Sequence, residues 1–160
     1  MKTKTLVLFI VMLSFGLMSS TCSKDDDSSS DDDQSQIPGW VQTAKAGTWK
    51  ISLYKDDGED ETYHYTGYAF TFGDNNVLTA VKGDDTTTGS WSITHDSSSG
   101  DDDDGGSSGD VDFNIFFSAP PVLEELSDDW DIINITSSKI ELVDVSGGNG
   151  GTDHLTFVKI

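Results

Sequence analysis

One segment of the sequence matches a pattern used in nucleophilic catalysis. Residues Gly105 to Gly109 read Gly-x-Ser-x-Gly, which places a reactive serine between a strand and a helix in hydrolases. Here the segment lies among Gly, Ser and Asp residues, a composition typical of a loop. The strand and helix that would position the serine are not predicted, so we expect the protein not to be an enzyme.

The same acidic region carries oxygen ligands of the kind that calcium prefers. Asp101, Asp103 and Asp112 stand at positions one, three and twelve of the calcium-loop template, and Gly106 stands at its glycine. The template needs flanking helices, whereas strands are expected here, so we interpret the segment as a solvated charged loop, with weak calcium binding as the alternative. The 3 histidines lack a cysteine or second histidine at ligand spacing, and we predict no other metal site and no cofactor.

The N-terminus has the features of a secretory signal. Lys2 and Lys4 precede an apolar run from Leu6 to Met18. This run is shorter than the roughly 20 residues that span a bilayer, and small residues follow it, as at a signal cleavage point. We therefore predict a signal peptide over residues 1–21.

Cys22, the chain's only cysteine, follows this segment directly. The sequence Ser19-Ser20-Thr21-Cys22 resembles the lipobox of bacterial lipoproteins. That resemblance implies that the Cys22 thiol is lipidated and anchors the mature chain in a membrane. The alternative is an ordinary cleaved signal that leaves a free thiol, which is unusual in a secreted protein.

An acidic tract follows the cysteine. Residues Lys24, Asp25 and Asp26 resemble the lysine-plus-acidic export signal of surface-displayed lipoproteins in Gram-negative bacteria, which implies an outer-membrane, surface-exposed protein. Residues 22–37 contain too little apolar surface to offset the entropy of ordering, so we expect a disordered acidic tether. A plain acidic linker without a sorting role is the alternative.

The remainder, residues 38–160, has the length of one domain. The chain has 29 acidic residues against 9 basic ones, all of them lysine, and a net charge of −20. Such a chain repels nucleic acid and anionic lipid headgroups, so we exclude nucleic acid as a partner.

Alternating apolar and polar residues in short runs separated by turn residues predict eight β-strands. The predicted strands are 47–55, 61–72, 77–82, 90–94, 111–117, 130–136, 139–145 and 154–160. Short links favour antiparallel neighbours in chain order. We predict an all-β, eight-stranded antiparallel up-and-down barrel with one short helix after Pro120-Pro121; an open sandwich is the alternative.

A hairpin that closes near Gly58-Glu59 would pair Trp49 with Tyr68, Ile51 with Thr66 and Leu53 with His64. Trp49, Tyr68 and Phe70 then point into the core. The opposite face would gather Tyr54, Tyr63 and Tyr65 as an exposed aromatic surface for a sugar or a protein, unless Ile37, Trp40 and the helical segment cover it.

The order of several motifs resembles the lipocalin-like domain of small Gram-negative lipoproteins. These motifs are Gly47-Thr48-Trp49, "AFTFGDNNVLTA", "GSWSI", "EELSDDWDI", "KIELVDVSGG" and "HLTFVK". The resemblance covers roughly residues 39–160 and implies a basic residue lying across Trp49, a role for which Lys159 is the candidate. It implies a small apolar ligand bound among Trp49, Tyr68, Phe70 and Lys159.

Two functions follow for this domain. The first is a binding module with a slim apolar ligand inside the barrel. The second is a surface interaction module that binds glycan or protein through its outer face, with a filled barrel. The bulk of Trp49, Phe70 and Phe72 predicts at most a small pocket, open at one end and floored by Trp49.

Overall fold

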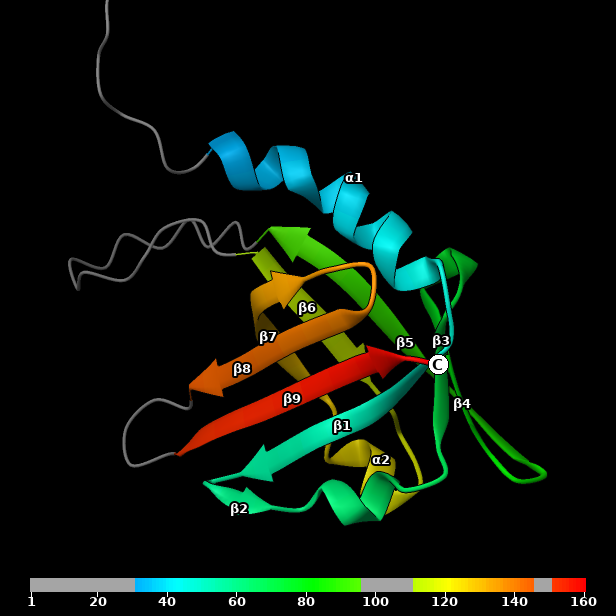
Figure 1. The fold of residues 1–160 in the computed structure, drawn as a ribbon. Coiled ribbons are helices and arrows are strands. Elements are labelled where there is room, and N and C mark those ends of the chain that lie inside the picture. The colour runs from blue at the N-terminus through cyan, green and yellow to red at the C-terminus, as the bar shows by residue number, and fades with distance from the viewer. Residues whose placement is uncertain (1–30, 96–110, 146–150) are drawn as a thin grey trace, which may run out of the picture.

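The structure is a computed structural model that describes residues 31–95, 111–145 and 151–160. Its body is a strongly twisted antiparallel sheet that curls into a barrel (Figure 1). The strands are β1 (Trp49–Asp56), β2 (Glu59–Asp60), β3 (Ala69–Phe72), β4 (Val77–Lys82), β5 (Asp85–His95), β6 (Val111–Phe116), β7 (Asp128–Ile135), β8 (Lys139–Val145) and β9 (Thr152–Lys159). The helices are α1 (Asp31–Lys45) and α2 (Pro121–Glu124), with 3₁₀ turns η1 (Thr62–Tyr65) and η2 (Asp74–Asn76).

The strands form a closed meander. Their order is β2-β1-β3-β4-β5-β6-β7-β8-β9, every pair is antiparallel, and β1 also pairs with β9. Because β2 is a two-residue extension paired with β1, the wall consists of eight strands. The predicted fold class is therefore confirmed, and closure explains how so short a sheet avoids exposed edges.

The predicted second strand, 61–72, is wrong over residues 61–68, and only Ala69–Phe72 form a strand. The chain turns at Asp57 and Gly58, which both have positive φ as a tight hairpin requires, and pairs Lys55 with Asp60. It then leaves the sheet as η1 and returns at β3, where Trp49 pairs with Phe70 instead of Tyr68. Tyrosines and a histidine in this segment suggested a strand, but the tertiary packing of η1 overrides that propensity.

The connection between the predicted strands 77–82 and 90–94 is also shorter than expected. Lys82 pairs directly with Asp85, so Gly83 and Asp84 alone make the turn. The three threonines Thr86–Thr88 join β5, as their β-branched side chains favour.

A β-bulge in β1 changes which residues face the core. Ile51 lies opposite Phe157 and Leu53 opposite Thr156, so two steps along β1 match one step along β9. Trp49 and Ile51 are buried before the bulge, and Tyr54 is buried after it. The inward-facing residues of β1 therefore have odd numbers before the bulge and even numbers after it.

Aromatic rings occupy the middle of the barrel. The ring of Phe72 lies 5.1 Å from that of Trp91, 5.2 Å from Phe113 and 5.5 Å from Phe157, measured between centroids. These distances are those of edge-to-face contact. Trp49 and Phe70, which were predicted to be core, are at most 1% exposed, as are Phe113 and Trp130, whereas Tyr68, also predicted to be core, is only partly buried.

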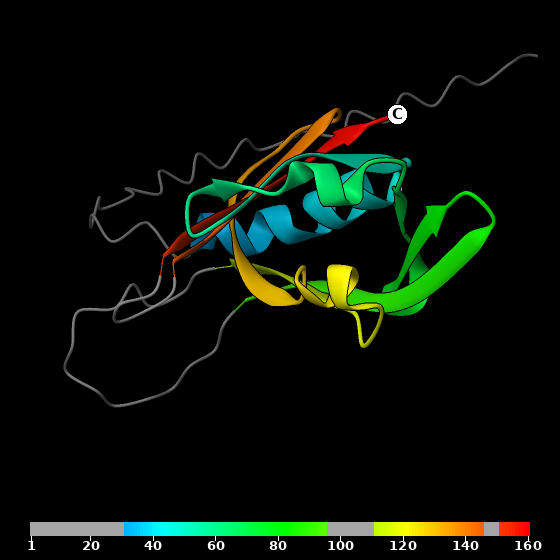
Figure 2. The ribbon, with the colours of Figure 1, turned by 90° about the horizontal axis from the view of Figure 1, so that it is seen from below.

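Helix α1 covers one end of this core and was not predicted. Ile37, Trp40, Val41 and Ala44 follow the i, i+3, i+4, i+7 spacing of an amphipathic helix and pack on the core. In the view from below in Figure 2, α1 is seen across the far end of the barrel, which agrees with its position at the top of Figure 1. The first part of α1, residues 31–37, was expected to belong to the disordered tether; the structure makes it helical.

The elements η1 and α2 lie at the end of the barrel away from α1 (Figure 1). The predicted short helix is confirmed as α2, which begins at Pro121, where a proline is well tolerated. Leu123 and Leu126 are fully buried, and the indole N–H of Trp130 donates to the Leu126 carbonyl at 3.1 Å. Both ends of the barrel are therefore covered by chain segments.

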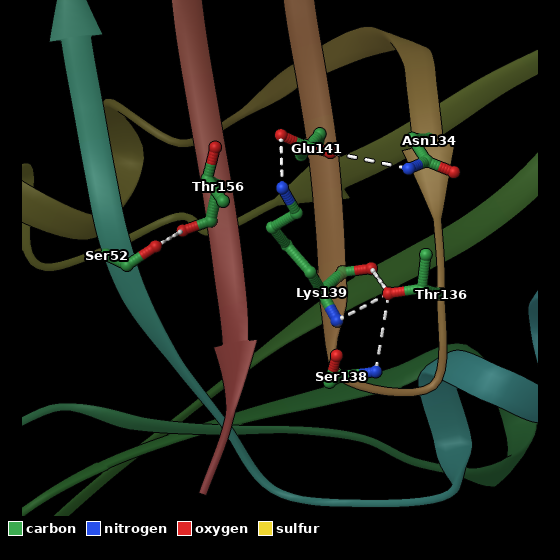
Figure 3. Close-up of polar contacts among 7 residues, drawn as sticks. All are labelled: Ser52, Asn134, Thr136, Ser138, Lys139, Glu141 and Thr156. Atoms are coloured by element: carbon green, nitrogen blue, oxygen red, sulfur yellow. Dashed lines mark hydrogen bonds and ion pairs between the residues drawn. The ribbon is translucent and has the colours of Figure 1, made fainter.

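The β7–β8 hairpin is fixed by one threonine side chain. Thr136 Oγ1 accepts the backbone N–H of Lys139 at 3.0 Å and donates to the Lys139 carbonyl at 3.1 Å (Figure 3). Lys139 Nζ in turn donates to Glu141 at 2.8 Å and lowers the pKa of that carboxyl. The Thr136 side chain thereby provides hydrogen-bond partners for the backbone of this turn, which contains no glycine.

Candidate functional site

The predicted ligand-binding residues lie at the end of the barrel near α1. Trp49 is fully buried, and its indole N–H donates to the Ala44 carbonyl at 2.8 Å, so α1 lies directly over it. Phe70 is fully buried beside it and Tyr68 is partly buried. These residues pack against other side chains and α1 of the same chain, so they contribute to the hydrophobic core.

Lys159 lies where the resemblance to lipocalin-like domains placed a basic residue. It pairs with Trp49 across β1 and β9, and its Nζ lies 5.8 Å from the centre of the Trp49 ring. The glycine at position 47 makes room for it, because a Cβ there would collide with the Lys159 stem. The Gly-x-Trp pattern thus has a packing explanation, with a cation–π contact at the barrel end.

The predicted exposed tyrosine surface is wrong. Tyr54 and Tyr65 are 3% and 2% exposed, and their rings meet edge to face at 5.0 Å. The bulge in β1 turned Tyr54 inward, and η1 replaced the strand that would have turned Tyr65 outward. Only Tyr63 of the three is exposed, at 67%, and it packs against the His64 ring.

The two buried tyrosines hold Glu125, the residue after α2. The Tyr54 hydroxyl donates to the Glu125 backbone carbonyl at 2.9 Å, and the Tyr65 hydroxyl donates to Glu125 Oε2 at 3.3 Å. Burial is the main cause that raises the pKa of both phenols far above 10; the charge of Glu125 adds to it for both, and that of Asp56 adds to it for Tyr54. Both hydroxyls therefore stay protonated and remain donors.

A cluster of metal-ligand type lies beside these tyrosines. Within the described ranges, Glu61, His64 and Glu125 each offer one ligand atom, and the three atoms lie within 4.8 Å of one another. His64 Nδ1 is 3.5 Å from Glu61 Oε2, is buried, and makes no hydrogen bond. Neither glutamate was predicted from the sequence, although the Glu-x-x-His spacing of Glu61 and His64 is a readable local signal.

A groove on the outer face crosses β5, β6 and β7. It has a volume of about 470 Å³. Ser92, Asn114 and Asp129 pair side by side across the three strands, and Phe116, opposite Ser90, is 57% exposed. Hydroxyl, amide and carboxylate groups thus lie next to one exposed aromatic ring.

Asp128 lines the same groove and has a shifted pKa. Burial, followed by the neighbouring carboxyls of Asp129 and Asp144, raises the pKa of Asp128 to about 6. Its Oδ1 accepts the Asp129 backbone N–H at 2.9 Å. This carboxyl can therefore change charge near neutral pH.

A second groove lies where β3 has left β1. Its volume is about 590 Å³, and Ile51, Tyr65, Tyr68, Ala69 and Ile160 are among its lining residues. It is more apolar in character than the groove on β5 to β7. The predicted pocket was to be floored by Trp49; this groove instead lies at the seam between β1 and β3, and Trp49 is not among its lining residues.

Other predicted residues fall largely beyond the described ranges. Cys22, Lys24, Asp25 and Asp26 precede them, and Asp101 and Asp103 lie in the gap between 95 and 111. Asp112 is within β6, opposite Thr94 and Asp131. None of the helices in the described part has the length and apolar character needed to cross a membrane.

Comparison with known proteins does not assign a family. No protein-family model matches the chain, and no curated protein matches it.

Proposed function

We propose that this chain is a lipid-anchored lipoprotein of the outer membrane, exposed at the cell surface, whose barrel binds a neutral glycan through its outer face. It would act as a non-enzymatic binding module of the lipocalin-like kind. The proposed lipid anchor and outer-membrane localisation rest on Cys22 and the Lys24-Asp25-Asp26 tract, together with the apolar segment before them.

The filled interior favours the outer face over a central cavity. Phe72 meets three aromatic neighbours at contact distance, and α1 covers the end at Trp49. A ligand inside would have to displace these rings, which would cost much of their burial free energy. Binding inside the barrel is therefore the less supported function.

The groove on β5 to β7 carries the glycan proposal. Its side chains alternate donors and acceptors along Ser92, Asn114 and Asp129, which suits hydroxyl groups, and Phe116 offers an apolar face for a sugar ring. Asn114 Nδ2 already donates to Thr94 Oγ1 at 2.9 Å, which fixes the amide. The net charge of −20 disfavours acidic glycans.

A second candidate is a slim apolar ligand in the seam groove between β1 and β3. Ile51, Tyr68 and Ile160 supply its apolar lining. The observation that favours this candidate is the departure of β3, which pairs with β1 only at Trp49 and Phe70 in the described register.

A glycan array followed by calorimetric titration of any neutral oligosaccharide that binds would test the proposal. Phe116→Ser should weaken binding by up to about tenfold, because an aromatic contact of this kind contributes roughly 0.5–1.5 kcal/mol. Ile133→Ser is the matched control, since Ile133 is equally 57% exposed on the outer wall. Glycan binding that survives Phe116→Ser unchanged would refute this site, and binding of an apolar probe abolished by Ala69→Trp would favour the seam groove.

A further inference from the structure

We propose that Glu61, His64 and Glu125 form a binding site for a divalent first-row transition cation, with zinc as its representative. The site lies between η1 and α2 at the barrel end opposite α1. It is separate from the groove on β5 to β7 and does not depend on the glycan proposal.

The spacing of the donor atoms fits a shared ion. Two ligands bound to zinc at about 2.0–2.1 Å in tetrahedral geometry lie roughly 3.3 Å apart. His64 Nδ1 and Glu61 Oε2 are 3.5 Å apart. The Glu125 atom lies within 4.8 Å of both, and its side chain is exposed, so a small rotation brings it into range.

The state of the imidazole points to a missing partner. A buried polar atom normally has a hydrogen bond, because leaving it unpaired costs about 1–3 kcal/mol. His64 Nδ1 is buried and has none, although it faces the Glu61 carboxylate. A cation between the two would satisfy the ring nitrogen and the carboxylate together.

The local backbone places two of the ligands on one side. Glu61 immediately precedes η1 and His64 lies within it, three residues later. In a 3₁₀ turn, residues i and i+3 are eclipsed, so their side chains project the same way. This pairing is local and needs no distant contact.

The third ligand, Glu125, is held in place by hydrogen bonds from the two buried tyrosines. The Tyr65 hydroxyl donates to Glu125 Oε2 at 3.3 Å, and the Tyr54 hydroxyl fixes the Glu125 backbone at 2.9 Å. Hydrogen bonds of this kind orient metal-binding carboxylates in known sites. The buried tyrosine pair thus keeps the Glu125 carboxylate beside Glu61 and His64, while its exposed side chain can make the small rotation that coordination needs.

The donor set selects the class of ion. Calcium and magnesium prefer all-oxygen coordination, whereas an imidazole with carboxylates suits zinc and its neighbours. Three protein ligands leave one position of a tetrahedral ion for water. The acidic chain raises the local concentration of cations generally.

Calorimetric titration of the full chain with Zn²⁺, in excess Mg²⁺ to occupy non-specific acidic sites, tests the proposal. We expect one zinc site, a zinc-dependent rise in melting temperature, and a Co²⁺ absorption spectrum typical of low coordination number. His64→Ala and Glu125→Gln should each weaken zinc binding more than about tenfold, and Tyr65→Phe about tenfold. The matched controls His154→Ala and Glu124→Gln should bind zinc like the parent.

Equal zinc affinity in the parent, His64→Ala and Glu125→Gln would overturn the site. An equal loss in the two control variants would do the same, because it would show diffuse binding to surface charge. If His64→Ala fails to fold, Glu125→Gln decides the question, since this exposed isosteric change keeps an acceptor for Tyr65.

Discussion

At the scale of single residues, Asp128 shows that the position of a carboxyl in the fold, and not only its residue type, sets its pKa. The chain carries 29 acidic residues, and a solvent-exposed carboxyl ordinarily has a pKa of about 4. Asp128 is the first residue of β7, is partly buried, and lies opposite Ile115. Partial burial and two neighbouring carboxyls raise its pKa to about 6, so folding favours its protonated form.

We predict that Asp128→Asn stabilises the protein at neutral pH. The folded-state pKa lies above the ordinary value of 3.8, so the folded state binds more protons between about pH 4 and pH 6. The free energy of unfolding of the parent therefore falls as pH rises through this window. At about pH 7.5 the variant should gain on the order of 1 kcal/mol, discounted for partial exposure, and near pH 4 it should gain nothing.

Urea unfolding at the two pH values measures this difference. Asp84→Asn in the β4–β5 turn removes the same charge from a site without such burial and serves as the control. A gain for Asp128→Asn that is equal at both pH values, or equal to that of Asp84→Asn, would contradict the prediction.

The buried tyrosines show the limit of prediction at this scale. Alternation predicted the inward residues Trp49 and Phe70 correctly, because strand periodicity of two is local. It misplaced Tyr54, because a bulge shifts the parity of all residues after it and leaves no clear mark in the sequence. The role of Glu125 could not be predicted for another reason: it contacts Tyr65, 60 positions away in the sequence, only after the barrel closes.

At the scale of elements, α1 is the segment that sequence reasoning missed. Aspartate-rich composition predicted a tether over residues 22–37 and a domain that begins at Pro38, although the spacing of Ile37, Trp40, Val41 and Ala44 is helical. The helix derives its stability from packing that apolar stripe on the open barrel end, since isolated helices of this length are marginal. Strand prediction located β4 and β6 to β9, and the second half of β5, because apolar and polar residues alternate there between clear turn residues.

We predict that Ala44→Glu detaches α1 and destabilises the barrel. Ala44 is fully buried and its carbonyl accepts the Trp49 indole N–H. An unpaired charge there should lower the free energy of unfolding by on the order of 3 kcal/mol, and the emission of Trp49 should shift to the red. Gln42→Glu adds the same charge on the exposed face and should leave both unchanged; matching effects of the two variants would refute the packing role of α1.

At the scale of the whole molecule, closure of the barrel and the negative charge of the chain both disfavour association with other chains. A barrel that pairs β1 with β9 leaves little sheet edge for another chain to join. A net charge of −20 adds repulsion between copies. A domain displayed on a crowded membrane surface would gain from both properties, which is consistent with the proposed anchor.

We predict that Cys22→Ala abolishes membrane anchoring. Lipidation requires the cysteine thiol, and alanine offers no nucleophile for the acyl-glyceryl group. Metabolic labelling with an alkyne fatty acid should give a labelled parent and an unlabelled variant that remains an uncleaved precursor or becomes soluble.

The barrel itself should be unaffected by this change, because Cys22 precedes the described part of the chain by several residues and α1 begins only at Asp31. Equal melting temperatures of the two barrels would therefore separate loss of the anchor from loss of the fold. Ser23→Ala, next to the cysteine, serves as the control and should keep the label. Unchanged fatty-acid labelling of Cys22→Ala would rule out Cys22 as the anchor and favour an ordinary cleaved signal, which leaves the barrel free of the membrane.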